Sequence, residues 1–281
     1  MVFERLIPTD NDLVENYSKY CYSEATICPE STRVSYRKIL KTFSKWRGDK
    51  RLLDIGCGQG DFLWESRLQG WVVSGIEFDR DAVNANCARG LSVAHGASAS
   101  EAYKGFIFDV ITAFEVIEHL RLPGDLLKNA AVLLPKGGLL YLTTPNFNSI
   151  TRFLDGYDNK DLFCWPDHLC FFTSASLRRL ARQHGFSVVR VRTTGIDPLQ
   201  LKRSLGYRVR NYFVNSIWPT HSKKNDSSVP SNLSLPEQSK REELRSLSYF
   251  NFKYSLLKSI VNCFLNAFGV GDTLKVWLVK L

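Results

Sequence analysis

The stretch that decides the fold reads Leu52-Leu53-Asp54-Ile55-Gly56-Cys57-Gly58-Gln59-Gly60. An apolar run leads into three glycines at alternate positions, and residues 61–69 continue with helical spacing. Glycine lets the backbone turn tightly and approach a ligand closely, and the free amides at a helix start favour electron-rich groups. The stretch therefore predicts a strand, a ligand-binding loop and a helix in succession.

The chain around this stretch alternates short apolar runs with longer mixed segments. We expect strands over residues 51–55, 72–77, 91–95, 110–114, 139–143 and 187–193. We expect helices over residues 31–46, 61–69, 80–89, 123–134 and 174–184, the last capped by Thr173 and stopped by Gly185. This alternation is typical of βαβ units, so the sequence predicts an α/β fold with a mainly parallel sheet and helices on both faces.

The composition excludes several classes of protein. With 44% hydrophobic and 23% charged residues among 281, the chain is neither disordered nor fibrous. Its seven cysteines form no CxxC pair, which indicates reduced thiols and argues against a zinc finger. No apolar run approaches the roughly 18 residues of a membrane span, and the first residues do not read as a signal peptide. We therefore expect a cytoplasmic protein.

Two regions are expected along the chain. Residues 1–195 form the α/β domain, and residues 196–281 form a C-terminal extension. Within the extension, residues 220–243 are rich in Ser, Asn, Pro, Lys and Glu and predict a flexible loop. Residues 254–268 have a helical apolar face and residues 273–281 read as a strand. The helix packs on the domain or, as the alternative, attaches the protein to the periphery of a membrane.

The charge balance favours an anionic partner. There are 37 Lys and Arg residues against 28 Asp and Glu, a formal net charge of +9. Nucleic acid, phospholipid and nucleotide-linked substrates all stay open on this ground. Residues 201–213 are basic and aromatic, and a solvated helix face is the default interpretation of them.

Glu77 ends the next predicted strand and is followed by Phe78. A carboxylate at the carboxyl end of a strand can accept two hydrogen bonds from a ribose diol, with Phe78 beside the base. The alternative is a surface carboxylate that begins a helix. A dinucleotide fingerprint is damaged because Asp61 stands at its third glycine position, and a P-loop is excluded because no Gly-Lys-Ser/Thr follows.

These motifs resemble class I S-adenosylmethionine-dependent methyltransferases. Residues 54–60 match the glycine-rich motif of the family, and Glu77 matches its ribose acid. Further matches follow in order at residues 108–120, 133–139, 143–146 and 167–173. The resemblance implies a Rossmann-like, seven-stranded sheet in the order 3-2-1-4-5-7-6, with the seventh strand antiparallel.

The resemblance also implies S-adenosyl-L-methionine as the cofactor. Ser98 stands near the position where many relatives place an acidic residue beside the adenine. The residues expected to bind the cofactor are Asp54, Gly56, Cys57, Gly58, Gly60, Glu77, Phe78, Ser98, Phe114 and Glu115.

Methyl transfer from a sulfonium needs alignment of the reactants, and a base only where the acceptor is a hydroxyl. His119 and His168 are the candidate catalytic residues, since an imidazole titrates near neutral pH. The alternative is that they only orient the loop. Glu115 and Glu118 with these histidines also resemble the divalent-metal ligands of small-RNA and quinone O-methyltransferases, or else they merely shape the pocket.

The methyl acceptor is open. Residues 167–173 and 271–275 resemble bacterial methyltransferases of glycoconjugate synthesis, so we expect O-methylation of a sugar or other small-molecule hydroxyl. The alternatives are a quinone-like phenol and an RNA 2′-hydroxyl, with nucleic acid not favoured. From another class, the chain could be a non-catalytic partner subunit that binds S-adenosylmethionine.

Overall fold

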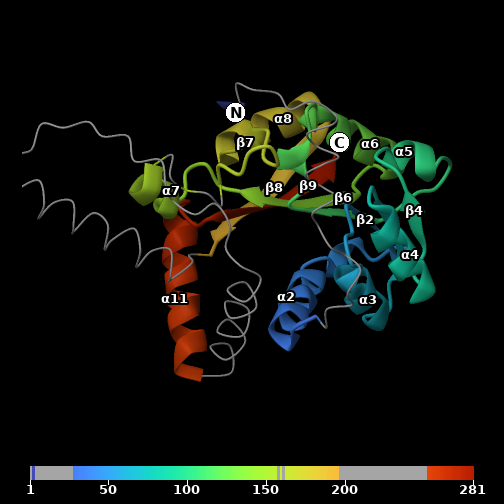
Figure 1. Ribbon diagram of the computed structural model, residues 1–281, viewed down its shortest axis with the longest axis horizontal. Helices are drawn as coiled ribbons and strands as arrows, with labels where there is room; N and C mark the ends of the chain where they lie inside the picture. The colour runs from blue at the N-terminus through green and yellow to red at the C-terminus, as the bar shows by residue number, and fades with distance from the viewer. Residues whose placement is uncertain (1, 4–27, 157–158, 160–161, 196–251) are drawn as a thin grey trace, which may run out of the picture.

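The computed structural model of the chain describes residues 2–3, 28–156, 159, 162–195 and 252–281. The expected flexible loop at 220–243 and the basic, aromatic residues 201–213 lie outside the described residues. Figure 1 shows the described part as a twisted sheet with helices packed on its two faces. The fold class predicted from the alternation of apolar runs is confirmed.

The main sheet has seven strands in the order β4-β3-β2-β5-β6-β9-β8. Counted along the chain, this is the order 3-2-1-4-5-7-6 that the resemblance implies, and β9 runs antiparallel to both of its neighbours. The strands are β2 (Arg51–Ile55), β3 (Val72–Glu77), β4 (Val93–His95), β5 (Val110–Phe114), β6 (Leu139–Pro145), β8 (Phe186–Thr194) and β9 (Thr273–Lys280).

Strand β9 comes from the expected C-terminal extension and fills the gap between β6 and β8. Its register pairs Thr273 with Pro145 of β6 and with Thr194 of β8. The division expected at residue 195 therefore separates two strands that are hydrogen-bonded along their length, and residues from both sides of it build one sheet.

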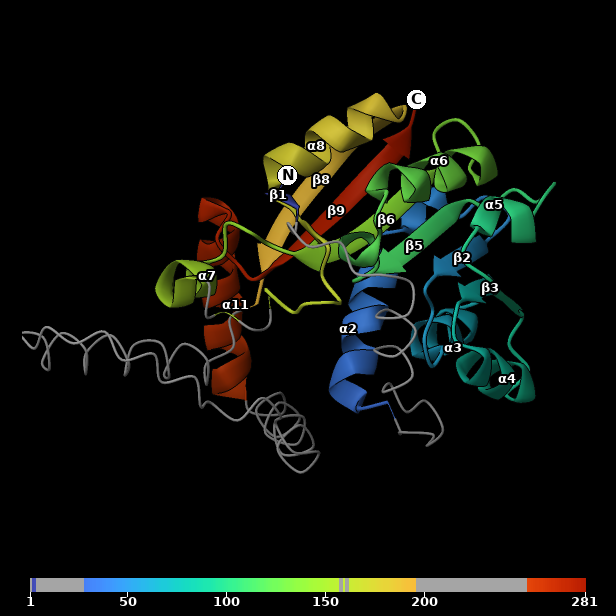
Figure 2. The same cartoon turned by 45° about the horizontal axis from the view of Figure 1, so that its top comes forward.

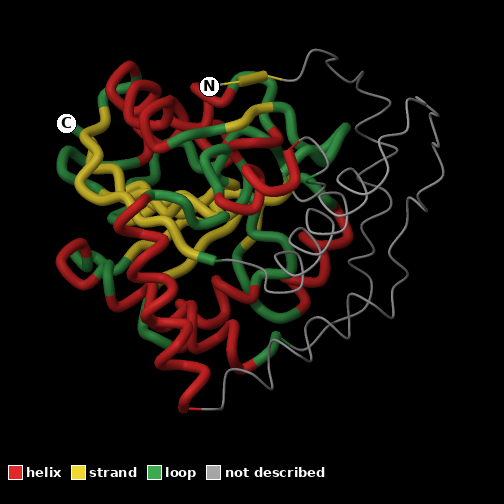
Figure 3. Tube along the Cα trace, turned by 90° about the vertical axis from the view of Figure 1, so that its left-hand side faces the viewer, coloured by secondary structure: helices red, strands yellow, loops and turns green. Residues whose placement is uncertain are grey.

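The helices cover both faces of the sheet. Residues of α2 and α3 pack on one face and residues of α5, α6 and α8 on the other, as Figure 3 shows with the strands between two groups of helices. The helices are α2 (Glu30–Lys41), α3 (Asp61–Leu68), α4 (Arg80–Ala88), α5 (Ala99–Ala102), α6 (Pro123–Leu133), α7 (Ile150–Asp155), α8 (Ser174–Gln183) and α11 (Phe252–Phe268). Two 3₁₀ turns, η1 (Ser44–Trp46) and η2 (Ile117–His119), and a small sheet of β1 (Val2–Phe3) with β7 (Cys170–Phe171) complete the described elements.

Most helix boundaries follow the local signals in the sequence. Thr173 and Ser176 form a reciprocal capping box at the start of α8, and Gly185 beyond its end has a φ of +78°. The helix predicted over 31–46 instead ends at Lys41. There the Thr42 hydroxyl donates to the Ile39 carbonyl, a local bond that competes with helix continuation.

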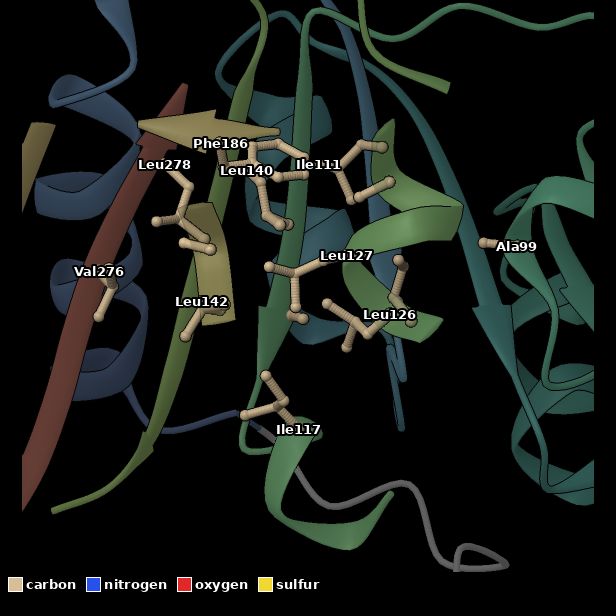
Figure 4. Packing of buried hydrophobic residues seen from close by; sticks show 14 of the residues in the cluster. Ala99, Ile111, Ile117, Leu126, Leu127, Leu140, Leu142, Phe186, Val276 and Leu278 are labelled. Atoms are coloured by element: carbon tan, nitrogen blue, oxygen red, sulfur yellow. The ribbon is translucent and has the colours of Figure 1, made fainter. Parts of the chain in front are cut away.

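The core lies on both faces of the central strands. Leu139, Leu140, Tyr141 and Leu142 of β6 are all 0% exposed, which is typical of a strand covered on both sides. Leu140 and Leu142 pack with Leu127 of α6, as Figure 4 shows. The continuous apolar run at this strand thus fixes it in the middle of the molecule.

Helix α11 stands apart from the two helical layers (Figure 2). It meets the sheet through Leu265, which is 1% exposed, and through Asn266, whose side chain accepts from the Thr193 amide. Phe264 and Phe268 on its predicted apolar face are more than half exposed. None of the described helices has the length and hydropathy needed to cross a membrane.

Candidate functional site

The predicted site residues gather where the parallel strands end. The glycine loop follows β2, Glu77 ends β3, and Glu115 follows β5. Because β2, β3 and β5 are parallel, their carboxyl ends lie at one edge of the sheet. Val116, the residue after Glu115, lies close to the glycine loop. A Cβ added to Gly56 would lie 2.6 Å from Cγ2 of Val116.

The loop after β2 needs its glycines. Gly56, Gly58 and Gly60 have φ values of +68°, +50° and +73°, a conformation that side-chain-bearing residues rarely adopt. A Cβ added to Gly58 would meet no atom within 4 Å. The backbone at Gly58 is therefore open on that side, and a ligand can lie directly against it.

Glu77 ties this loop to the neighbouring strand. Its Oε2 accepts from the Gly58 amide at 2.8 Å, and its Oε1 accepts from the amides of Phe78 and Asp79 at 2.7 and 3.1 Å. A carboxylate has about four acceptor positions, so it can still receive a hydroxyl hydrogen bond. The residues present fit a ribose diol beside the glycine loop.

The next loop along this edge offers an aromatic face and a hollow. Phe78 is 56% exposed and stacks on His95, with ring centroids 6.3 Å apart. The Ser98 hydroxyl donates to Oδ1 of Asn129 at 3.2 Å. Ser98 and Asn129 help to line a hollow of about 410 Å³ between α5 and α6. Phe78 therefore presents an exposed aromatic ring at this edge, and Ser98 is hydrogen-bonded to the protein.

Asp54 and Cys57 support the loop from inside the protein. Asp54 is 2% exposed, and its Oδ1 accepts from the Thr112 hydroxyl at 2.6 Å. Burial raises the pKa of Asp54 to about 7, although the Thr112 hydrogen bond acts in the opposite direction. Burial also raises the pKa of the Cys57 thiol, which is 8% exposed. Both side chains are thus held away from solvent.

Phe114 belongs to an aromatic cluster under α2. Its ring centroid lies 4.6 Å from that of Phe62 and 6.0 Å from that of Tyr36. Burial raises the pKa of the Tyr36 hydroxyl, and the neighbouring acids Asp54 and Asp61 raise it further. Tyr36 therefore lies within electrostatic reach of the two acids that flank the glycine loop. Its helical spacing in the sequence indicated only a core position, so its place beside the site was missed.

Glu118, His119 and His168 form a second group of polar side chains at this edge. One potential ligand atom from each lies within 4.8 Å of the others. The two histidine rings, from segments far apart in the chain, have centroids 5.0 Å apart. The structure therefore brings together the two histidines that the sequence singled out.

Backbone carbonyls fix the orientation of both imidazoles. His119 Nδ1 lies 2.9 Å from the carbonyl oxygen of Asp167, and His168 Nδ1 lies 2.8 Å from that of Leu162. Each Nδ1 therefore carries the proton and donates, which leaves Nε2 with its lone pair. This is the arrangement in which a histidine acts as a base or as a metal ligand.

The carboxyl of Glu118 is buried with half of its hydrogen-bonding capacity unused. It is 1% exposed, and its Oε2 accepts from the Thr144 hydroxyl at 2.9 Å. Its Oε1 has no hydrogen-bond partner among the described residues. A buried acceptor without a partner is costly, and a cation at this point would remove that cost.

Burial and neighbouring charges shift the pKa values of Glu118 and His119 toward their neutral forms. Burial raises the pKa of Glu118 well above its ordinary value, and the nearby Glu115 raises it further. Burial lowers the pKa of His119, as does the neighbouring His168. An imidazole with a lowered pKa beside a buried carboxyl with a raised pKa suits a base or a cation site.

Glu115 directly follows strand β5 and has an unusual backbone conformation. Its φ is +51°, one of two positive values among the described residues other than glycine. Its surface still reaches solvent, but its surroundings desolvate it and raise its pKa, while the neighbouring Thr143 and Glu118 act in the opposite direction. A strained residue held at a strand end is typical of a functional position.

The aromatic residues around His168 do not form one pocket floor. Phe171 and Phe172 are 3% and 0% exposed and pack inside the protein, whereas Trp165 is 52% exposed. Phe172 belongs to the main hydrophobic cluster. Packing is therefore the role of the two phenylalanines.

Comparison with known proteins places the chain in a family. A family model described as "Methyltransferase domain" matches residues 30–191. The ubiquinone biosynthesis O-methyltransferase of Aeromonas salmonicida is 28% identical over 185 residues, which cover 61% of this chain and 78% of that protein. The protein of the same name from Burkholderia orbicola is 35% identical over 106 residues, 35% of this chain and 46% of the relative.

Solved structures agree on the fold. A SAM-dependent methyltransferase from Archaeoglobus fulgidus has a TM-score of 0.54 at 15% identity and covers 88% of this chain and 93% of its own. A putative sarcosine dimethylglycine methyltransferase from Galdieria sulphuraria has a TM-score of 0.51 at 14% identity, covering 89% and 85%. With the family match over residues 30–191 and the glycine loop joined to Glu77, the chain belongs to the class I S-adenosylmethionine-dependent methyltransferases.

Proposed function

We propose that this methyltransferase transfers the methyl group to a hydroxyl of a small molecule that presents two neighbouring oxygens, a catechol-like phenol in the first place. The observation that carries the proposal is the group of Glu118, His119 and His168, whose potential ligand atoms lie within 4.8 Å of one another and whose Glu118 Oε1 has no hydrogen-bond partner among the described residues. The similarity to ubiquinone biosynthesis O-methyltransferases supports the phenol.

In this proposal the cofactor lies along the glycine loop. Glu77 holds the ribose diol, the Gly56–Gly60 backbone lies against the cofactor, and Phe78 covers the adenine, with Ser98 at its edge. Asp54, Cys57, Phe114 and Glu115 shape the loop and the strand end around it. When bound, S-adenosylmethionine supplies a methyl group that is already activated on a sulfonium. The protein aligns the acceptor oxygen with that group and excludes water.

The histidines handle the proton. His119 or His168 would accept the proton of the acceptor hydroxyl at Nε2. The methyl group would pass from the sulfonium to the acceptor oxygen, with the carbon–sulfur bond breaking and S-adenosylhomocysteine leaving. The Nδ1 protons, held by the Asp167 and Leu162 carbonyls, keep each Nε2 ready to accept. Because His119 has a lowered pKa, it stays neutral and able to accept a proton at neutral pH.

A divalent cation is the alternative occupant of the same group. Glu118, His119 and His168 would hold it, with Glu115 beside them, and each Nε2 would then bind the cation in place of the proton. When bound, the cation would supply Lewis acidity that lowers the pKa of the acceptor hydroxyl. Two imidazoles and a carboxylate leave open positions for paired substrate oxygens. This proposal accounts for the unpartnered Oε1 of Glu118.

The C-terminal extension borders the acceptor site in this proposal. Lys275 of β9 lies close enough to Glu115 for its charge to lower the pKa of that carboxyl, against the larger effect of burial. Lys275 pairs in register with Thr143 of β6, whose hydroxyl accepts from the Glu115 amide.

A sugar hydroxyl is the second candidate acceptor, since the net charge of +9 favours a nucleotide-linked sugar.

The test is methyl transfer from radiolabelled S-adenosylmethionine to a catechol acid, a panel of nucleotide sugars and a short RNA, each with and without chelator and added Mg²⁺ or Zn²⁺. The proposal expects transfer to the catechol and its loss on chelation. Transfer to a nucleotide sugar would favour the second candidate. Transfer to RNA alone, or binding of the cofactor without turnover on any acceptor, would overturn the small-molecule proposal.

A further inference from the structure

Asn86, on helix α4, is completely buried beside the glycine loop. It is 0% exposed, and its Nδ2 donates to the carbonyl oxygen of Gly58 at 2.7 Å. Asn84 on the same helix is exposed, so the burial is specific to position 86. A buried amide at this place needs a reason, because an apolar side chain would avoid the cost of desolvation.

Gly60 leaves room for this amide. A Cβ added to Gly60 would lie 2.0 Å from Oδ1 of Asn86 and 2.8 Å from its Cγ. The same Oδ1 has no hydrogen-bond partner among the described residues. The unsatisfied Oδ1 of Asn86 costs stability, and this cost accompanies the hydrogen bond that its Nδ2 donates to the Gly58 carbonyl.

The peptide groups of the loop are held from two sides. The Gly58 amide donates to Glu77, while the Gly58 carbonyl accepts from Asn86. The next carbonyl, of Gln59, accepts from Nη1 of Arg89 at 2.6 Å. The end of α4 thus fixes the peptide planes that face the open side of Gly58.

We propose that Asn86 is a positioning residue for the cofactor. By holding the Gly58 carbonyl, it keeps the glycine loop in its binding conformation before S-adenosylmethionine arrives, so the cofactor does not have to order the loop. Asn86 acts through Gly58 and does not touch the reacting atoms. The proposal rests on the cofactor site described above and is independent of the identity of the acceptor.

The first experiment compares Asn86→Leu with the matched control Asn84→Leu. We expect Asn86→Leu to bind S-adenosylhomocysteine about tenfold more weakly by calorimetry, the loss of one hydrogen bond to a buried carbonyl. KM for S-adenosylmethionine should rise by a similar factor while kcat stays within about twofold. Asn84→Leu should leave both unchanged. Unchanged affinity in a folded Asn86→Leu, or an equal fall in kcat, would overturn the proposal.

A second experiment covers the case in which Asn86→Leu does not fold. Asn86→Ala, Gly60→Ala and the double variant form a cycle read by S-adenosylhomocysteine affinity. Because the Cβ of Gly60→Ala collides with the Asn86 amide, we expect Gly60→Ala to weaken binding less in the Asn86→Ala background. Additive losses would overturn the proposal.

Calorimetry needs no acceptor, so these results hold whether or not the catechol is methylated. A wild-type chain that binds no S-adenosylhomocysteine would refute the inference about Asn86 itself.

Discussion

Oε1 of Glu118 lies 4.0 Å from Nε2 of His119, and this Oε1 has no hydrogen-bond partner among the described residues. The other imidazole nitrogen and the other carboxyl oxygen are both held, by Asp167 and by Thr144. Because each side chain is held at its other polar atom, these two atoms keep their separation. His168 supplies the third side chain of the group, with a potential ligand atom within 4.8 Å of the other two.

Glu118→Gln should lower metal affinity on the order of 100-fold, because it removes the anionic ligand but keeps the shape of the side chain. It should also raise the free energy of unfolding above the pH of about 4.5 at which a free Glu ionises. The wild-type carboxyl has a raised pKa in the folded state, so the unfolded chain releases its proton first and wild-type stability falls as the pH rises.

Metal content after dialysis and urea unfolding at pH 5 and pH 8 check both effects. Glu101→Gln, an exposed position on α5, is the control and should change neither. Glu118→Gln with undiminished metal content would remove Glu118 from the site.

Asp54→Asn should flatten the pH dependence of stability between about pH 4 and pH 7. The pKa of Asp54 is raised from 3.8 to about 7 by burial. In that window the unfolded chain has lost the proton and the folded chain keeps it, so wild-type stability falls by up to about 1.4 kcal/mol per pH unit from this group. Chemical unfolding from pH 4 to pH 8 measures the difference between wild type and variant. If the stability of Asp54→Asn depended on pH as that of the wild type does, the prediction would be contradicted. Asp49→Asn, at an exposed site, is the control and should show the wild-type pH dependence.

Glu115→Gly and Glu115→Ala should separate strain from function. Both remove the carboxyl, so both should lower kcat. Only glycine accepts a φ of +51° without cost, so Glu115→Gly should be more stable than Glu115→Ala by about 1 kcal/mol. Thermal melts and initial rates measure the two effects separately. Equal stability of the variants would mean that the backbone at this position is not strained.

Glu77→Ala should weaken S-adenosylhomocysteine binding on the order of 100-fold, about 2.7 kcal/mol. The change removes the ribose acceptor and also leaves the Gly58 amide without its partner. Isothermal titration measures the loss, with Asp81→Ala on the exposed side of α4 as the control. Retained affinity would place the ribose elsewhere.

The local parts of the site could be predicted from the sequence. Strand β2, its glycine loop and Glu77 lie within one βαβ unit, where short-range spacing determines the geometry. The meeting of His119 and His168 could only be suggested by resemblance, since 48 residues separate His119 from its backbone partner Asp167. Burial and hydrogen bonding across such a distance leave no periodic signal.

Tyr36 and Asn86 were missed for a different reason. Tyr36 has the spacing of a core residue and Asn86 that of an ordinary polar position on a helix, and both descriptions are true of their own elements. What sets them apart is a neighbour on another element: Asn86 donates to Gly58 of the glycine loop, and Tyr36 packs on Phe62, just after that loop. Helical periodicity identifies which face is buried and does not identify what that face touches.

The position of β9 has a consequence for the order in which the chain matures. Strands β6 and β8 are made early, but they are joined only through β9, whose first residue pairs with Thr194 from a distance of 79 residues along the chain. During synthesis, strands β2 to β6, which carry the glycine loop, can therefore pair before β9 is available to pair with β6. Such a long-range antiparallel insertion is slow. The half of the sheet that carries the glycine loop should thus form first, and β9, which carries Lys275 between β6 and β8, should be the last strand to join the sheet.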